Sequence, residues 1–147
     1  MTDAQVYLKS IGDAEARIEL KTRQLQNLRD RMLCLSAPMD KEQVSHTKNV
    51  GVMADTIALI LDMEAEIDQQ TSAFLQKKRD AIRMMSQIPP ESAELLAARY
   101  FDRKTFEEIG RIMFITKRHA IRKHKEALAR FQAVLDQDQE NMSLDVT

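Results

Sequence analysis

The fold is decided by residues 105–128, which read TFEEIGRIMFITKRHAIRKHKEAL. This stretch predicts a short helix, a tight turn at Phe114-Ile115 and a second, basic helix that Thr116 caps. Thr105 is placed to cap the first helix, and Glu108 three residues later completes the sequence pattern of a capping box. Two helices joined in this way are typical of a helix-turn-helix, whose second helix enters the major groove of DNA.

The second helix of this motif has two chemically different faces. Arg118, Arg122 and Lys125 fall within an arc of about 60° on one face, at 100° per residue. The opposite face is mostly apolar and is predicted to pack against the protein, with His124 as a packed, hydrogen-bonded residue. Its members are Ala120, Ile121, His124, Ala127, Leu128, Phe131, Val134 and Leu135. This division suits a recognition helix, and the alternative interpretation is a solvated basic face.

Charge is distributed unevenly along the chain. The net charge is −1 over 147 residues, but ten basic and only four acidic residues lie between Arg99 and Arg130, which gives that window +6 and the remainder −7. A basic module joined to an acidic body indicates a polyanion as the partner of the basic part. With 3 Gly, 3 Pro and no Trp, the composition favours long helices over β-turns or a large globular core.

Two apolar seven-residue repeats occupy the first 88 residues. One runs from about Asp3 to Leu35, where the charged Lys21 interrupts the seam, and the other from about Val50 to Ile88. Such repeats predict amphipathic helices that pair as a coiled coil, and the polar residues 39–49 predict a loop between them. We therefore expect a long antiparallel helical hairpin.

Each helix of this hairpin buries only one stripe, so a second copy of the chain is the simplest additional partner. We expect a homodimer through the apolar seam. The predicted dimerisation residues are Ile11, Ile18, Leu25, Leu28, Met53, Ile60, Ile67 and Phe74.

The sequence thus predicts an all-α fold, in which a coiled-coil hairpin precedes a helix-turn-helix. Pro89-Pro90 ends the second long helix, because the residue before a proline is pushed out of helical geometry. The expected divisions are residues 1–88 for the hairpin and oligomerisation, 89–136 for the DNA-binding domain, and 137–147 for a disordered acidic tail.

Residues 105–112 resemble the first helix of the helix-turn-helix in region 4 of sigma factors. The chain is more similar still to ArpU/RinA-type regulators of bacteriophage late genes, from about Val6 to Phe131. Two C-terminal stretches carry this likeness, Arg99-Tyr100-Phe101-Asp102-Arg103-Lys104 and Ile115-Thr116-x-Arg118-x-Ala120-x-Arg122. Three stretches of the long helices add to it: Tyr7-Leu8-Lys9, Met53-Ala54-Asp55-Thr56-Ile57 and Glu64-Ala65-Glu66-Ile67. Departures are Phe114, where many relatives carry Gly, and Ala120 and Lys123, where many carry larger apolar residues.

The resemblance implies a phage- or prophage-encoded transcriptional regulator that binds double-stranded DNA in the cytoplasm of a bacterial host, and it allows a sigma-like contact with RNA polymerase. In such motifs the start of the second helix reads bases, which favours Lys117, Arg118 and His119 for that role. The complete set of predicted DNA-contacting residues is Arg103, Lys104, Thr105, Thr116, Lys117, Arg118, His119, Arg122, Lys123 and Lys125.

Catalysis and cofactors are not expected. The three glycines are isolated, so no phosphate-binding glycine loop is present, and His119 and His124 lie about 140° apart on a helix, which does not suit a shared metal. We expect no metal, no small-molecule substrate and no membrane association. Two alternative functions stay open: a DNA-packaging subunit like a small terminase, and a protein-only adaptor that acts on RNA polymerase or a host regulator.

Overall fold

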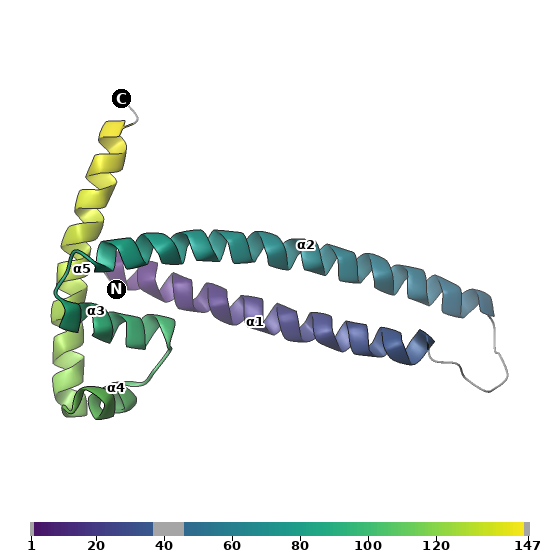
Figure 1. Cartoon of the computed structure of the whole chain (residues 1–147), viewed down its shortest axis with the longest axis horizontal. Helices are drawn as coiled ribbons and strands as arrows, with labels where there is room; N and C mark the ends of the chain where they lie inside the picture. Colours follow the sequence, from purple (N-terminus) through teal and green to yellow (C-terminus); the bar gives the residue numbers. More distant parts are fainter. Residues whose placement is uncertain (1, 37–45, 146–147) are drawn as a thin grey trace. The chain divides into compact units, whose positions relative to one another are not determined.

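The computed structural model describes residues 2–36 and 46–145, and these residues form helices and short connections without strands (Figure 1). The elements in chain order are α1 (Asp3–Ser36), α2 (His46–Met85), α3 (Pro90–Leu96), the π-helical turn η1 (Ala97–Phe101), α4 (Phe106–Met113) and α5 (Lys117–Asp145). The predicted all-α class, with a helical hairpin before a helix-turn-helix, is confirmed. The second long helix begins at His46 rather than near Val50, and the rest of the expected loop, residues 37–45, lies outside the described residues.

The chain divides into two compact units. Glu15–Ala73 forms the hairpin unit, whereas Met1–Ala14 and Phe74–Thr147 together form the core unit. The first turns of α1 and the last turns of α2 therefore belong with the C-terminal helices, and this differs from the expected division at residue 88. A seven-residue repeat indicates which face of a helix is buried but not which partner covers it.

In the hairpin unit, α1 and α2 run antiparallel and join through both apolar and charged side chains. Leu25 and Ile60 are buried. Lys21, which interrupts the apolar seam, forms an ion pair with Glu66 of α2, so its charge is matched across the hairpin. The remaining predicted dimerisation residues of this unit, Ile18, Leu28, Met53 and Ile67, are half-buried.

The core unit is organised around one apolar cluster that four helices share with η1. Leu8 and Phe131 are fully buried in it, and burying a side chain of this size stabilises a fold by roughly 1.5–3 kcal/mol. Ile11 is 1% exposed within the same cluster, and Phe74 packs against it. The assignment of Ile11 to a dimer surface is therefore wrong, because this side chain is enclosed by its own chain.

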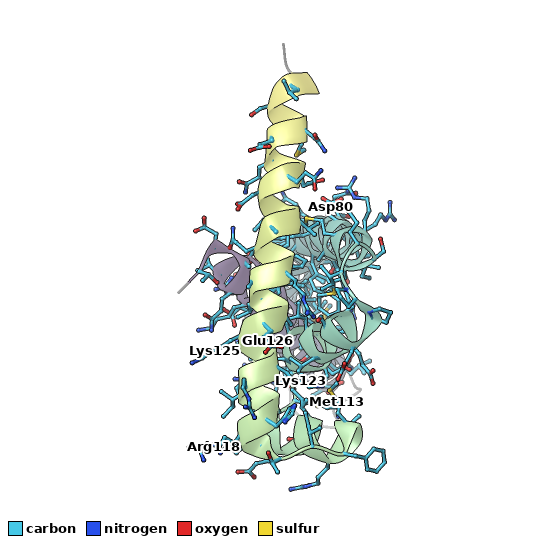
Figure 2. All side chains as sticks on the ribbon, turned by 90° about the vertical axis from the view of Figure 1, so that its left-hand side faces the viewer. Asp80, Met113, Arg118, Lys123, Lys125 and Glu126 are labelled. Atoms are coloured by element: carbon cyan, nitrogen blue, oxygen red, sulfur yellow. The ribbon has the colours of Figure 1, made fainter. Side chains whose placement is uncertain are left out.

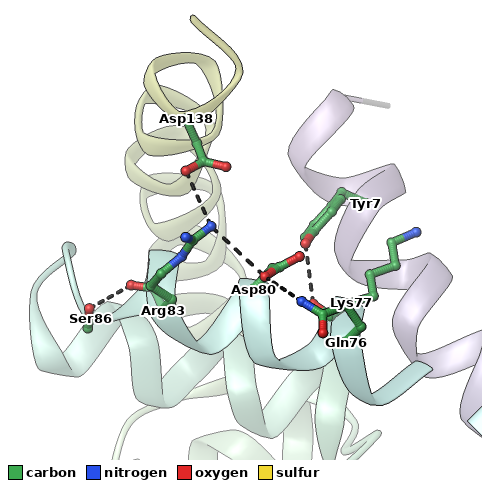
Figure 3. Close-up of polar contacts among 7 residues, drawn as sticks. All are labelled: Tyr7, Gln76, Lys77, Asp80, Arg83, Ser86 and Asp138. Carbon is green, nitrogen blue, oxygen red and sulfur yellow. Dashed lines mark hydrogen bonds and ion pairs between the residues drawn. The ribbon is translucent and has the colours of Figure 1, made fainter. Parts of the chain in front are cut away.

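Polar contacts fasten α1 and α5 to the end of α2 in the core unit (Figure 3). The Tyr7 hydroxyl donates a hydrogen bond to the carbonyl of Lys77, at 3.4 Å. Arg83 of α2 pairs with Asp138 of α5, with 3.4 Å between Nη2 and Oδ1. At the start of α1, the backbone N–H of Ala4 donates to the side-chain carbonyl of Gln132, at 2.7 Å. These contacts join the first turns of α1, the end of α2 and α5 to one another.

The last helix is longer than expected. α5 continues to Asp145, so the prediction of a disordered tail from residue 137 is wrong for residues 137–145. Two observations account for the extension: the stretch contains no Gly or Pro, and Asp138 pairs with Arg83 one turn beyond the buried Leu135. A charged stretch without apolar periodicity can therefore remain helical when it continues a helix that is already anchored.

Candidate nucleic-acid interface

The first helix of the motif begins with the predicted cap. Thr105 has extended backbone geometry, and its Oγ1 accepts a hydrogen bond from the backbone N–H of Glu108, at 3.2 Å. The same hydroxyl donates to the Glu108 carboxylate, at 3.1 Å. A threonine cap of this kind stabilises a helix by about 1 kcal/mol. The start of α4 is thereby defined at Phe106, as the sequence predicts.

The turn between α4 and α5 is unusual because a bulky residue occupies its left-handed position. Phe114 has φ 59° and ψ 43°, and its side chain is 93% exposed. Gly110 makes the turn possible, because a Cβ at this position would lie only 2.7 Å from the carbonyl oxygen of Ile115. The N–H of Ile115 donates to the Gly110 carbonyl at 2.9 Å, which closes the turn. The turn is thus formed with a non-glycine residue, Phe114, in the left-handed position.

The second helix begins with another threonine cap and sits on a small apolar cluster. Oγ1 of Thr116 accepts from the N–H of His119, at 3.1 Å. Ala120 is fully buried together with Leu95 and Ile109, and these three residues form a core of their own. The methyl side chain of Ala120 is enclosed completely, so a small residue suits the close approach of the helices here.

The two-faced character of α5 is confirmed. Arg118, Arg122 and Lys125 are exposed, whereas Ala127 and Phe131 on the opposite face are fully buried. Arg118, Arg122 and Lys125, together with Ile121, line a shallow depression on the surface. Figure 2 shows that Arg118 and Lys125 project from the same side of α5, and that Lys123 lies on the other side, near Met113. We call Arg118, Arg122 and Lys125 the basic face.

Two lysines predicted to contact DNA have acidic partners within the chain. Lys117 forms an ion pair with Glu107 of α4, at 3.3 Å, and both side chains are more than half exposed. Lys123 forms an ion pair with Glu91 of α3 and is only 28% exposed. This contact lowers the pKa of the Glu91 carboxyl, chiefly through the hydrogen bond from Lys123. Lys123 therefore holds α5 against α3, outside the basic face.

The turn that precedes the motif places Arg103 and Lys104 differently. Arg103 is exposed and adopts φ 57°, a left-handed conformation that is uncommon outside glycine. Lys104 is half-buried; its backbone N–H donates to the Ala98 carbonyl at 3.0 Å, and its own carbonyl accepts from Arg99 at 3.0 Å. The backbone of this turn is thus held by η1, and the Arg103 side chain is directed to the surface.

His124 is a packed, hydrogen-bonded histidine, as predicted. It is 7% exposed, its Nε2 lies 2.7 Å from the Tyr100 hydroxyl, and its ring meets the Phe106 ring edge-on at 5.0 Å. Burial, assisted by the nearby Arg99 guanidinium, lowers the pKa of His124 to about 4. The ring is therefore uncharged at neutral pH, and it links η1, α4 and α5 rather than adding to the positive surface.

The sequence interpretation missed two basic residues beside this site. Lys9 of α1 and Arg99 of η1 line a cavity together with Arg103 and Lys125. No sequence signal connects residue 9 with residues 99–125, because the residues meet only after the first turns of α1 have joined the core unit. The Arg99 guanidinium lies over the Phe106 ring at 4.2 Å, which orients it.

Among the residues that the structure describes, no group of three or more His, Cys, Asp or Glu side chains is arranged to hold a metal ion. The same residues include no helix that combines the length and the apolar character needed to cross a membrane.

The capped α4, the closed turn and the two-faced α5 together define a helix-turn-helix domain of the DNA-binding type. The comparison with protein families agrees: residues 84–133 match the family model of sigma-70, region 4. This match extends from the end of α2 into α5 and includes every residue predicted to contact DNA. Searches of curated proteins and of solved structures each found no significant match.

Proposed function

We propose that the protein is a sequence-specific transcriptional regulator that reads the major groove of double-stranded DNA with the start of α5. The observation that carries this proposal is the basic face: three exposed cations lie opposite a buried apolar face, on the helix that follows a closed turn in a sigma-70 region 4 segment. An amphipathic helix alone would not specify DNA. The position of these cations supports the proposal, because the second helix of a helix-turn-helix is the element that enters the major groove.

The contacts divide by position along α5. Arg118, which is exposed at the start of the helix, suits base edges, because a guanidinium can bind guanine through two hydrogen bonds. Arg122 and Lys125 lie further along the same face and suit backbone phosphates, which set the register of the protein on the duplex. Lys117 and His119 remain predicted contacts; Lys117 would exchange its solvent-exposed pair with Glu107 for DNA at little cost.

The biological setting is also proposed. The similarity to ArpU/RinA-type regulators supports a phage or prophage gene whose product acts in the bacterial cytoplasm. The sigma-70 region 4 match supports RNA polymerase as a second partner. We propose that the protein acts by binding alone, without catalysis or a cofactor.

We further propose that the protein is a dimer, with its interface on a second stripe of α2. The predicted residues Leu25 and Ile60 are already buried within one chain. Val50, Ile57 and Leu61, in contrast, are spaced by seven and four residues on one face of α2 and are 61%, 42% and 59% exposed. Pairing of this stripe between two copies would form a coiled-coil bundle and present two helix-turn-helix motifs to two half-sites.

Selection of DNA from the source genome tests the proposed function. The purified protein is incubated with sheared fragments at about 150 mM salt, where nonspecific binding is weak, and the retained fragments are sequenced. We expect a small set of loci that share a short motif. Uniform retention of all fragments, or retention of none, would contradict a sequence-specific regulator.

Light scattering on the same sample tests the dimer. A mass of twice the 16.9 kDa chain is expected, and Ile57→Asp with Leu61→Asp should reduce it to one chain. Gln69→Asp with Ala73→Asp, which places two charges at exposed positions on a different face of α2, shows whether added charge alone dissociates the protein. A ring-sized oligomer would instead favour the DNA-packaging alternative.

A further inference from the structure

A cavity of about 460 Å³ lies beside the basic face, between the first turns of α1, η1 and α5. It belongs entirely to the core unit, and its polar lining is strongly cationic. Lys9, Arg99, Arg103 and Lys125 contribute four positive charges, against the one negative charge of Asp13.

The cavity exists because α1 approaches η1 closely at Gly12. A Cβ on this glycine would lie 2.9 Å from the backbone carbonyl oxygen of Tyr100, so a side chain at this position would push the two elements apart. Lys9 lies one helical turn before Gly12 and therefore faces the same cavity. This close approach, together with the burial of Leu8 and Ile11, brings a lysine of the N-terminal helix to the helix-turn-helix.

The cavity lining includes a guanidinium that is held in place by its neighbours and two polar side chains that are bonded to each other. Arg99 is held by its hydrogen bond to the Lys104 carbonyl at 3.0 Å and by the face of the Phe106 ring. The hydrogen bond uses Nη1, and a guanidinium carries five N–H donors in a fixed plane. Tyr100 and His124 in the lining are bonded to one another and add no charge at neutral pH.

The cavity is continuous with the basic face. Ile121 and Lys125 line both the cavity and the depression that contains Arg118 and Arg122. A ligand that covers Arg118, Arg122 and Lys125 therefore reaches the cavity, because Lys125 belongs to both surfaces. Three exposed cations on one side and Lys9 with Arg99 on the other form one positive surface, which concentrates anions.

We propose that this cavity is a phosphate-binding site that extends the DNA-binding surface from α5 to Lys9 of α1. The inference rests on the proposed function where the phosphate is supplied by the DNA backbone beside the bases that α5 reads. A free nucleotide offers the same chemistry, and the volume lies within the range of small-molecule sites. Lys9 provides the charge from α1 in both cases, beside the Arg99 guanidinium that η1 holds in place.

Lys9→Gln tests the site, with Arg79→Gln as the matched control. Lys9 and Arg79 are both exposed cations of the core unit, so each substitution removes one positive charge. Lys9 lines the cavity, whereas Arg79 lies on α2 outside the cavity lining. The dissociation constant of the full-length protein for its selected duplex is measured from 50 to 300 mM salt. Loss of one phosphate contact should make the negative slope of log K against log salt less steep by about 0.9 and weaken binding several-fold. Lys9→Arg should restore the slope, and Arg79→Gln should leave it unchanged.

A second arm titrates the wild-type protein with ATP and follows the backbone amide signals of residues 9 and 99 by NMR. Two results together would assign the cavity to a free nucleotide. The signals shift saturably with ATP, and Lys9→Gln lowers the affinity for ATP about tenfold. The same substitution leaves the slope of log K for DNA against log salt unchanged. An unchanged DNA slope together with no Lys9-dependent ATP binding would overturn the proposed site. If the wild type binds no DNA at all, the proposed function fails, and the ATP arm alone decides the cavity.

Discussion

The hydroxyl of Tyr100 lies 2.7 Å from Nε2 of His124, so one buried hydrogen bond joins η1 to α5 beneath the candidate interface. His124 has a pKa of about 4 in the folded protein, because burial and Arg99 disfavour its charged form. Its ordinary pKa is 6.5, so the unfolded chain binds the proton more tightly. Uncharged His124 therefore contributes its full share to the free energy of unfolding above pH 6.5, and this contribution is lost as the pH falls from 6.5 to 4.

We expect the free energy of unfolding to fall by up to about 3 kcal/mol across this interval through His124. Urea unfolding at pH 7, 6, 5 and 4.5 measures this change in the free energy of unfolding. His124→Gln, which does not titrate, should be less stable at pH 7 but should lose less stability on acidification than the wild type. Parallel pH profiles for the two proteins would show that His124 is not the group responsible.

Gly110→Ala should destabilise the helix-turn-helix by about 1–3 kcal/mol, since something must shift to admit the added Cβ. The nearest obstacle is backbone, the Ile115 carbonyl oxygen at 2.7 Å, and not a flexible side chain. Thermal unfolding measures the change. Gly51→Ala is the matched control, because no atom lies within 4 Å of its added Cβ in the second turn of α2. It should stabilise the protein by about 0.5–1 kcal/mol, and equal effects of the two variants would contradict the close approach.

The elements of the helix-turn-helix could be predicted because their signals are local. Thr105 and Thr116 cap helices within three residues, and the spacing of Ala120, Ala127 and Phe131 defines a buried face of α5. These signals depend only on backbone geometry near each residue. The sequence interpretation was therefore accurate where neighbours along the chain determine the structure.

The partners of the long helices were not predictable in the same way. The repeat that contains Ile11, Ile18 and Leu25 looks continuous, yet Ile11 lies in the core unit and the other two in the hairpin unit. The positive cavity depends on Lys9 meeting residues about 90 positions later, and no spacing rule reports such a meeting. The partner of Lys123 was missed for the same reason, since Glu91 lies on a different helix.

Phe114→Gly should stabilise the protein by about 1 kcal/mol. The left-handed conformation at φ 59° is unfavourable for a side chain with a Cβ, and a 93% exposed phenyl ring contributes almost no burial in compensation. A rise in Tm of a few degrees is expected, with DNA affinity measured in parallel. A decrease in Tm would mean that the Phe114 ring makes contacts that matter in solution.

Ile11→Ala should lower the free energy of unfolding by about 2–4 kcal/mol without changing the oligomeric state. The side chain is 1% exposed inside the core unit, so its removal leaves a cavity within one chain. Urea unfolding and light scattering measure the two properties on the same sample. Dissociation of a dimer with unchanged stability of the chain would return Ile11 to an intermolecular interface.

The central claim is that the basic face of α5 binds duplex DNA. Its most direct test compares the wild type with Arg118→Ala plus Arg122→Ala on a selected duplex at about 150 mM salt, by fluorescence anisotropy. Arg17→Ala plus Arg23→Ala, exposed on α1, removes the same charge elsewhere. We predict at least about a thirtyfold loss of affinity for the first variant, from two lost contacts of about 1–3 kcal/mol each, with unchanged helicity and an unaffected control. Equal affinity of all three proteins would contradict the account.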